Sequence, residues 1–200
     1  MFKKKAGPES FLRPPCLWQT LRYEDVRMYF LGETTAMDAF IAAWDAKMYY
    51  DYARPYSLIH DYYKEQPIKA WGGPKKGMVQ MKGKDWRPYS PETFLCPPFP
   101  SYVSGHSCVS GARSEALRFF TGSDNFGLEV KLVPGVLTEP DNISDTVDLS
   151  FPTFTKTADM AGLSRVLGGY HIQADNVEGL ALGRKVARAA WEKYREHTGR

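Results

Sequence analysis

The sequence predicts an all-α fold: a helical bundle with long loops and one candidate β-ribbon. Three observations support this prediction. The longest stretch without glycine or proline runs from Thr34 to Arg54, and apolar residues recur near helical spacing in residues 107–120 and again in residues 174–194. The chain has 200 residues, 43% of them hydrophobic, which is enough to bury the core of one domain.

The N-terminal region divides into an irregular segment and the start of the bundle. Residues 1–20 contain three prolines, and we expect them to be irregular. Residues 21–200 are expected to form a single helical domain. Its first element is a short helix over residues 21–32, which we expect to end at Gly32 because glycine commonly terminates helices.

The glycine- and proline-free run predicts a second helix, which Pro55 disturbs at Arg54. Lys47 and Arg54 are seven residues apart, so they point the same way on this helix. The same stripe contains Phe40 and Trp44 and must face a core or a cleft. Two cations on such a stripe need an anionic partner, because unpaired buried charge is costly. The alternative is an exposed ladder of ion pairs, in which Asp51 lies between Lys47 and Arg54.

The middle of the chain is rich in loops and also contains the candidate ribbon. Residues 56–66 are expected to continue as helix. Residues 67–103 contain seven prolines, and so long an irregular segment inside a domain is usually functional. Residues 128–132 and 147–151 alternate apolar and polar side chains, which predicts a small two-stranded ribbon. A further helix is expected from Thr153 or Thr155 to about residue 167.

A Ser-Gly-His corner precedes the helix expected over residues 107–120. Ser104 is a candidate N-cap, and Gly105 allows a ligand close to the backbone. The unpaired N–H groups of a helix start can hold an oxyanion. His106 stands beside them as a proton donor or acceptor near neutral pH. The alternative interpretation is an ordinary helix cap.

A third cluster lies between the last two expected helices. Arg165 and His171 flank two glycines, and Asp175 follows the histidine by four residues, within reach to orient its imidazole. By itself, this spacing is equally consistent with an ordinary local hydrogen bond between His171 and Asp175. Together the three clusters supply three cations, a helix start and two histidines, which suit an oxyanion of phosphate size.

These clusters form three motifs in order: Lys-x6-Arg-Pro over 47–55, a segment over 101–106 that ends in Ser-Gly-His, and Ser-Arg-x5-His-x3-Asp over 164–175. The chain thereby resembles the superfamily of vanadium-dependent haloperoxidases and type 2 phosphatidic-acid phosphatases, from about residue 22 to residue 195. It is most similar to the C-terminal half of the soluble haloperoxidase-like branch. Val103 stands where this superfamily usually has proline.

The resemblance implies a helical bundle of the haloperoxidase and acid phosphatase type, and an enzyme that oxidises halide with hydrogen peroxide to a hypohalous species. It implies vanadate as the cofactor, with its oxygens held by Lys47, Arg54, Ser104, Gly105 and Arg165. His171 would bind the vanadium, His106 would be the acid and base, and Lys47 would polarise bound peroxide. Trp44 and Phe99 would line the halide side, with core packing as an equal interpretation.

Two other functions remain open from the same residues. In a phosphomonoesterase of the superfamily, His171 would attack a phosphate ester to form a phosphohistidine, Asp175 would orient it, and His106 would protonate the leaving group, with no cofactor. The third alternative is an inactive oxyanion-binding module left by truncation.

The remaining expectations concern partners and location. The family branch has an N-terminal helical half that this chain is expected to lack, so apolar surface would be exposed at residues 21–31 and on the outer face of the last helix, or covered in a homodimer. The net charge of +3 argues against nucleic acid as a partner. No apolar run is long enough for a membrane span, and no signal peptide is visible. We expect a soluble chain, whose compartment the sequence does not assign.

Overall fold

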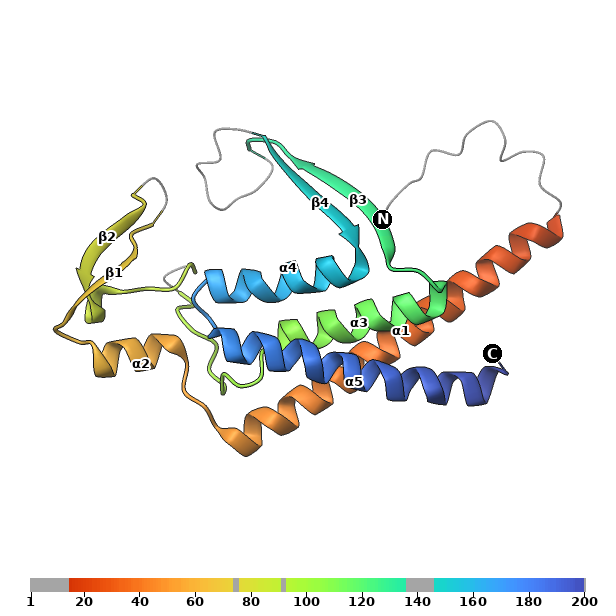
Figure 1. Cartoon of the computed structure of the whole chain (residues 1–200), viewed down its shortest axis with the longest axis horizontal. Helices are drawn as coiled ribbons and strands as arrows, with labels where there is room; N and C mark the ends of the chain where they lie inside the picture. The colour runs from red at the N-terminus through yellow and green to blue at the C-terminus, as the bar shows by residue number, and fades with distance from the viewer. Residues whose placement is uncertain (1–14, 74–75, 91–92, 136–145, 200) are drawn as a thin grey trace.

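The computed structural model describes residues 15–73, 76–90, 93–135 and 146–199 (Figure 1). These residues are mainly helical, which confirms the predicted helical bundle. The helices are α1 (Pro15–Tyr50), α2 (Pro55–Tyr62), α3 (Gly105–Thr121), α4 (Phe154–Leu167) and α5 (Gln173–Thr198). Among the helices of the described residues, none is both long and apolar enough to cross a membrane.

Helix α1 is longer than expected at its N-terminal end. It begins at Pro15 and passes through Gly32 without a break, so the irregular segment expected over residues 1–20 and the helix end expected at Gly32 were wrong here; residues 1–14 lie outside the described residues. A glycine inside a helix costs only about 1 kcal/mol. Packing of α1 along α3 and α5 offsets this cost, and the side chain of Arg113 lies against Gly32.

Helix α1 is also shorter than expected at its C-terminal end. It ends at Tyr50, and Asp51 takes a positive φ of 44°. Arg54 is extended and is the N-cap residue of α2, with Pro55 in the first turn. The residue before a proline avoids the helical region, which explains why the chain turns here. Lys47 and Arg54 therefore lie on separate segments and do not form the exposed ladder.

Helix α3 lies at the centre of the bundle and packs against α1, α4 and α5 (Figure 1). Small residues allow the helices to approach closely: a Cβ added at Gly183 of α5 would overlap the backbone carbonyl of Cys108 in α3, and one at Gly179 would crowd that of Ser104. Ser104 N also donates to Asp175 O over 3.0 Å. The first turns of α3 and α5 are thus held side by side.

Two antiparallel ribbons project from the helices (Figure 1). The predicted ribbon is confirmed as β3 (Asn125–Leu132) paired with β4 (Val147–Thr153). A second ribbon pairs β1 (Pro67–Trp71) with β2 (Met78–Lys82). Residues 67–103 were expected to be irregular, because glycines and prolines close to both strands favoured a loop.

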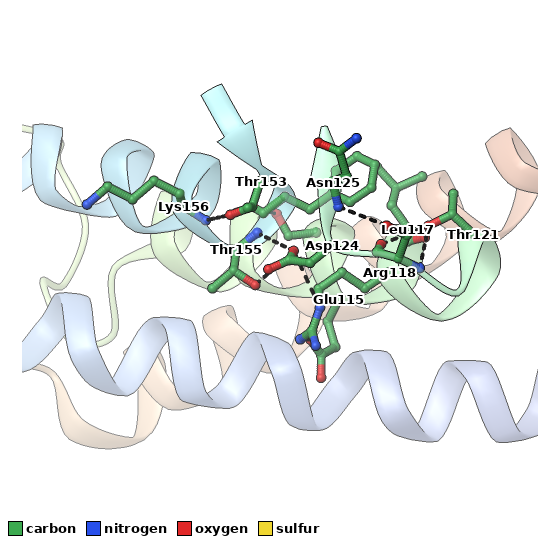
Figure 2. A network of polar contacts seen from close by, with 12 residues as sticks. Glu115, Leu117, Arg118, Thr121, Asp124, Asn125, Thr153, Thr155 and Lys156 are labelled. Atoms are coloured by element: carbon green, nitrogen blue, oxygen red, sulfur yellow. Dashed lines mark hydrogen bonds and ion pairs between the residues drawn. The ribbon is translucent and has the colours of Figure 1, made fainter. Parts of the chain in front are cut away.

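Figure 2 shows how the β3–β4 ribbon is joined to α3 and α4. Asp124 accepts hydrogen bonds from the backbone N–H and the hydroxyl of Thr155, over 3.0 and 3.1 Å, and forms an ion pair of 3.4 Å with Arg118 of α3. Thr153 caps α4 by accepting from Lys156 N over 2.9 Å. This network fixes the start of α4 against the end of α3.

Candidate active site

A cavity of about 220 Å³ opens between α1, the loop before α3, the first turn of α3, and the end of α4. Its lining includes most of the site residues expected from the sequence: Trp44, Lys47, Arg54, Phe99, Gly105, His106, Arg165 and His171. Ser104 and Asp175 do not line it, and both are buried. The hydroxyl of Ser104 accepts a hydrogen bond from Ser107 N over 3.3 Å, as expected of an N-cap.

Lys47 is buried, with 3% of its surface exposed. Its Nζ donates to the backbone carbonyls of Pro100 and Ser101, each over 2.8 Å. Burial, and then the nearby charge of Arg54, lower the pKa of Lys47 to about 8. An ammonium has three N–H donors, so after these two bonds a third remains for an acceptor in the cavity.

Arg54 is held by four acceptors around its guanidinium. Its Nε donates to Phe99 O over 3.0 Å, and its terminal nitrogens donate to Pro100 O over 3.3 Å and to Tyr170 O over 3.1 Å. One terminal nitrogen also lies 3.1 Å from Nε2 of His171. Burial lowers the pKa of Arg54, but an arginine remains charged in proteins. The result is a fixed cation at the cavity wall.

Arg165 stacks its guanidinium over the ring of Tyr170, with Cζ 4.3 Å from the ring centroid. Its Nε is buried and, among the described residues, has no hydrogen-bond partner. An unpaired buried N–H on a cation is costly. Beside it, a Cβ added at Gly105 would meet no atom within 4 Å. The cavity therefore has both an unsatisfied donor and open space over a helix start, which fits a bound oxyanion.

His171, Asp175 and Ser101 form a buried chain of hydrogen bonds. Nδ1 of His171 lies 2.9 Å from Oδ2 of Asp175, and the same oxygen accepts from the hydroxyl of Ser101 over 2.5 Å. Because Nδ1–H donates to the carboxylate, Nε2 carries no proton and accepts from the N–H of Arg54. Burial lowers the pKa of His171 against the opposing effect of Asp175, so the imidazole is neutral near pH 7.

The pKa of Asp175 is also lowered. Burial by itself would raise it, but the hydrogen bonds from His171 and Ser101 outweigh that effect. The carboxylate therefore stays ionised and holds the imidazole in one tautomer and one orientation. Nε2 of His171 then carries its lone pair at the cavity wall, where it accepts from Arg54, so a ligand that binds through Nε2 would replace that hydrogen bond.

His106 lies in the first turn of α3 and lines the cavity from an exposed position. Partial burial, followed by the nearby charge of Arg165, lowers the pKa of His106. The neutral form of this histidine is therefore favoured near pH 7 and can accept a proton from a ligand that enters the cavity.

Trp44 and Phe99 form an aromatic wall of the cavity. Their ring centroids are 4.7 Å apart in an edge-on arrangement. Phe99 also lies beneath two cations, with its centroid 5.4 Å from Lys47 Nζ and 5.0 Å from Arg54 Cζ. Both rings line the cavity, so core packing is not their only role.

Sequence reasoning missed Ser101 and the pair formed by Ser107 and Asn176. Ser107 donates to Asn176 Oδ1 over 2.8 Å, which joins the starts of α3 and α5. Ser101 begins the segment that ends at the Ser-Gly-His corner, but a lone serine gives no signal of its own. Its contact with Asp175 spans 74 residues and depends on the fold.

Residues 27–200 match a family model described as the VCPO second helical-bundle domain. Among solved structures, the chain is similar to a bacterial vanadium-dependent chloroperoxidase in its holo form, with 27% identity, a TM-score of 0.75, and coverage of 84% of this chain and 35% of that chain. The apo form gives 26% identity, a TM-score of 0.77, and coverage of 86% and 36%.

The chain is also similar to a structure described as the first bacterial vanadium-dependent iodoperoxidase, with 29% identity, a TM-score of 0.61, and coverage of 85% of this chain and 34% of that chain. The chain thus spans about a third of the length of these solved structures. A comparison with curated protein sequences gives no match.

Proposed function

The chain belongs to the family described as the VCPO second helical-bundle domain, and from this membership we propose that it contains the active site of a vanadium-dependent haloperoxidase. The reaction is oxidation of a halide by hydrogen peroxide to a hypohalous species. One observation supports the proposal above the others. Three cations converge with His171 on one cavity, and the buried Nε of Arg165 has no hydrogen-bond partner among the described residues.

The residues fit vanadate as the resident group. Lys47, Arg54 and Arg165 would hold its oxygens from the side chains, and Gly105 would do so from the start of α3, where backbone N–H groups lack helical partners. The backbone N–H of Ser104 donates to Asp175 O, so the expected contact from Ser104 would come from its hydroxyl. His171 would bind the vanadium through Nε2. When bound, vanadate supplies the activation of hydrogen peroxide for two-electron oxidation of the halide.

Proton handling falls to His106. Overall, hydrogen peroxide, one halide ion and one proton give hypohalous acid and water. A neutral His106 accepts a proton from incoming peroxide and returns it to the departing oxygen. The third N–H of Lys47 donates to an oxygen in the cavity and withdraws charge from it, which favours attack by halide.

The aromatic wall suits the halide. Trp44 and Phe99 both line the cavity, and ring edges carry partial positive charge that can face an anion. The cations next to Phe99 add attraction for an anion. We assign the halide approach to these two rings.

A phosphomonoesterase is the second candidate, and one observation favours it. The Asp175 carboxylate leaves Nε2 of His171 unprotonated, which is the state that a nucleophilic histidine needs. Nε2 would attack phosphorus, the phosphorus–oxygen bond would break, and His106 would protonate the alcohol that leaves. Water would then hydrolyse the phosphohistidine.

An exposed apolar stripe on α1 supports a helical partner. Tyr23, Phe30, Met37 and Trp44 recur every seven residues and are 62%, 63%, 59% and 39% exposed, a spacing typical of helix packing. Within the expected segment 21–31, Tyr23, Val26, Tyr29 and Phe30 are exposed as expected, whereas Leu31 is buried. On α5 the exposed large hydrophobic residue is Val177. We propose that a preceding helical bundle covers this stripe, with a second copy of the chain as the alternative.

Peroxide-dependent bromination of a dye, with and without added orthovanadate, tests the proposed function. We expect bromination only when orthovanadate is present. His106→Ala should abolish it, whereas His197→Ala, an exposed histidine near the end of α5, should not. A folded chain that does not brominate but hydrolyses an aryl phosphate would establish the phosphatase instead. A folded chain with neither activity would indicate the inactive oxyanion-binding module.

A further inference from the structure

A second cavity of about 190 Å³ lies along α3, between α4 and the start of the β3–β4 ribbon. Its walls are mainly apolar and include Leu117, Phe126, Phe154, Ala158 and Ala161. None of these residues belongs to the three motifs or to the proposed anion site. The cavity therefore needs its own explanation.

The second cavity adjoins the first through Ser110, which lines both. On α3, Ser110 follows His106 by one turn, and Ser114 in the second cavity follows by two. At a rise of about 1.5 Å per residue, these steps are about 6 and 12 Å along the helix axis. One face of α3 thus runs from the acid–base histidine of the first cavity into the apolar walls of the second.

Aromatic rings dominate the far wall of the second cavity. Phe126 and Phe154 stack with centroids 5.1 Å apart and an interplanar angle of 29°, and Phe126 is 41% exposed. Ala158 and Ala161 follow Phe154 on the same face of α4 and contribute small side chains to the lining. Arg113, the charged residue of the lining, forms an ion pair of 2.6 Å with Glu33. The lining therefore favours a neutral, flat, apolar ligand.

The volume of the second cavity also suits a flat, apolar ligand. An apolar cavity of about 150 Å³ accepts benzene, so the second cavity has room for one or two fused rings. Its shape is held by the network in Figure 2, in which Asp124 binds Thr155 of α4 immediately before β3 begins. Phe126 follows Asp124 by two residues.

We propose that the second cavity binds a neutral aromatic substrate, which receives the oxidised halogen from the first cavity. The halogen transfer rests on the proposed haloperoxidase function. In that transfer, hypohalous acid forms a carbon–halogen bond at the ring, the ring loses a proton, and that proton leaves with the hydroxide as water. Ser110 stands at the boundary that the hypohalous acid crosses.

Binding of 2-naphthol, measured by equilibrium dialysis, tests the site without requiring turnover. Ala161→Phe should fill the cavity and Phe126→Ala should remove its aromatic wall, so each is expected to weaken naphthol binding about tenfold. The matched controls are Ala189→Phe on the exposed side of α5 and Phe94→Ala in the loop before α3, which should leave binding within about twofold. Thermal unfolding of each variant verifies that it is folded.

Orthovanadate provides the second readout. The two cavities are separate, so naphthol and orthovanadate should bind together, and Ala161→Phe should retain orthovanadate binding. Equal naphthol affinity in the wild type and both cavity variants would overturn the proposal, as would displacement of naphthol by orthovanadate. Naphthol binding that depends on Ala161 and Phe126 in a chain that does not brominate would retain the aromatic site and reject the haloperoxidase.

Discussion

The hydroxyl of Ser101 lies 2.5 Å from Oδ2 of Asp175, the same oxygen that is 2.9 Å from Nδ1 of His171. Ser101 and Asp175 are each 1% exposed. One carboxylate oxygen therefore receives two donors in a dry environment. On the far side of the ring, Nε2 of His171 faces the guanidinium of Arg54 over 3.1 Å. The imidazole is fixed from both sides before any ligand arrives.

Removal of the Ser101 hydroxyl should loosen this arrangement. We expect Ser101→Ala to weaken orthovanadate binding about tenfold, because partners that orient a ligating histidine typically contribute that much. The pKa of Asp175 should rise with the loss of one donor. Equilibrium dialysis measures the affinity, and carboxyl chemical shifts in an NMR titration follow the pKa.

Ser164→Ala is the matched control, because Ser164 is exposed and donates to Ala161 O within α4. It should bind orthovanadate as the wild type does. If Ser101→Ala also bound like the wild type, Ser101 would have no positioning role.

The charge of Lys47 should give the site a pH dependence. Its pKa is lowered to about 8, by burial first and then by Arg54, and a lysine is charged below its pKa. Binding of an oxyanion should therefore be strongest below pH 8 and weaken above it. Tungstate is a suitable probe, because it is the anion of a stronger acid and stays fully ionised while Lys47 titrates.

Lys47→Met provides the comparison for this titration. The variant should bind tungstate more weakly at neutral pH and should lack the decline above pH 8. A decline of the same size in Lys47→Met would assign the pH dependence to another group.

Arg165 should contribute to ligand binding more than to stability. Its Nε has no partner among the described residues, so little hydrogen bonding is lost on replacement. We expect Arg165→Lys to weaken orthovanadate binding about tenfold, since a lysine keeps the charge but loses the planar donor pair. Arg188→Gln, an exposed arginine of α5, should have no effect. Unchanged binding in Arg165→Lys would show that the planar donors of Arg165 are not used.

Close packing of α3 and α5 predicts contrasting effects of two glycine substitutions. Gly183→Ala would place a Cβ into the carbonyl of Cys108, and it should destabilise the chain by about 2 kcal/mol or more. Gly105→Ala meets open space at the start of α3, so its free energy of unfolding should stay within about 1 kcal/mol of the wild type. Its Cβ should instead impair orthovanadate binding. Urea unfolding compares the two, and equal stabilities would contradict the packing described here.

Much of the helical architecture follows from local sequence signals. Ser104 and Thr153 cap α3 and α4 as expected, and the β3–β4 pairing follows its alternation. The helix expected over residues 21–32 and the one expected from Thr34 are joined, because tertiary packing offsets the cost of Gly32 inside α1. Arg54 is extended before Pro55 as expected, but α1 already ends at Tyr50, because the chain turns at Asp51.

The part of the candidate site that consists of motif residues could be predicted from the sequence. Lys47, Arg54, Arg165 and His171 were chosen for their chemistry and spacing, and the fold brings them together. Ser101 could not be chosen in this way, because its role depends on Asp175, which is distant in sequence. The second cavity along α3 likewise depends on the ribbon lying beside α4, which no local pattern predicts.

Binding of orthovanadate to the purified chain is the most direct test of the proposed vanadate site. We expect saturable binding of one orthovanadate per chain in equilibrium dialysis. His171→Ala should weaken that binding more than about tenfold, and His197→Ala should not change it. A folded chain without saturable binding, or equal binding by the wild type and His171→Ala, would contradict the account.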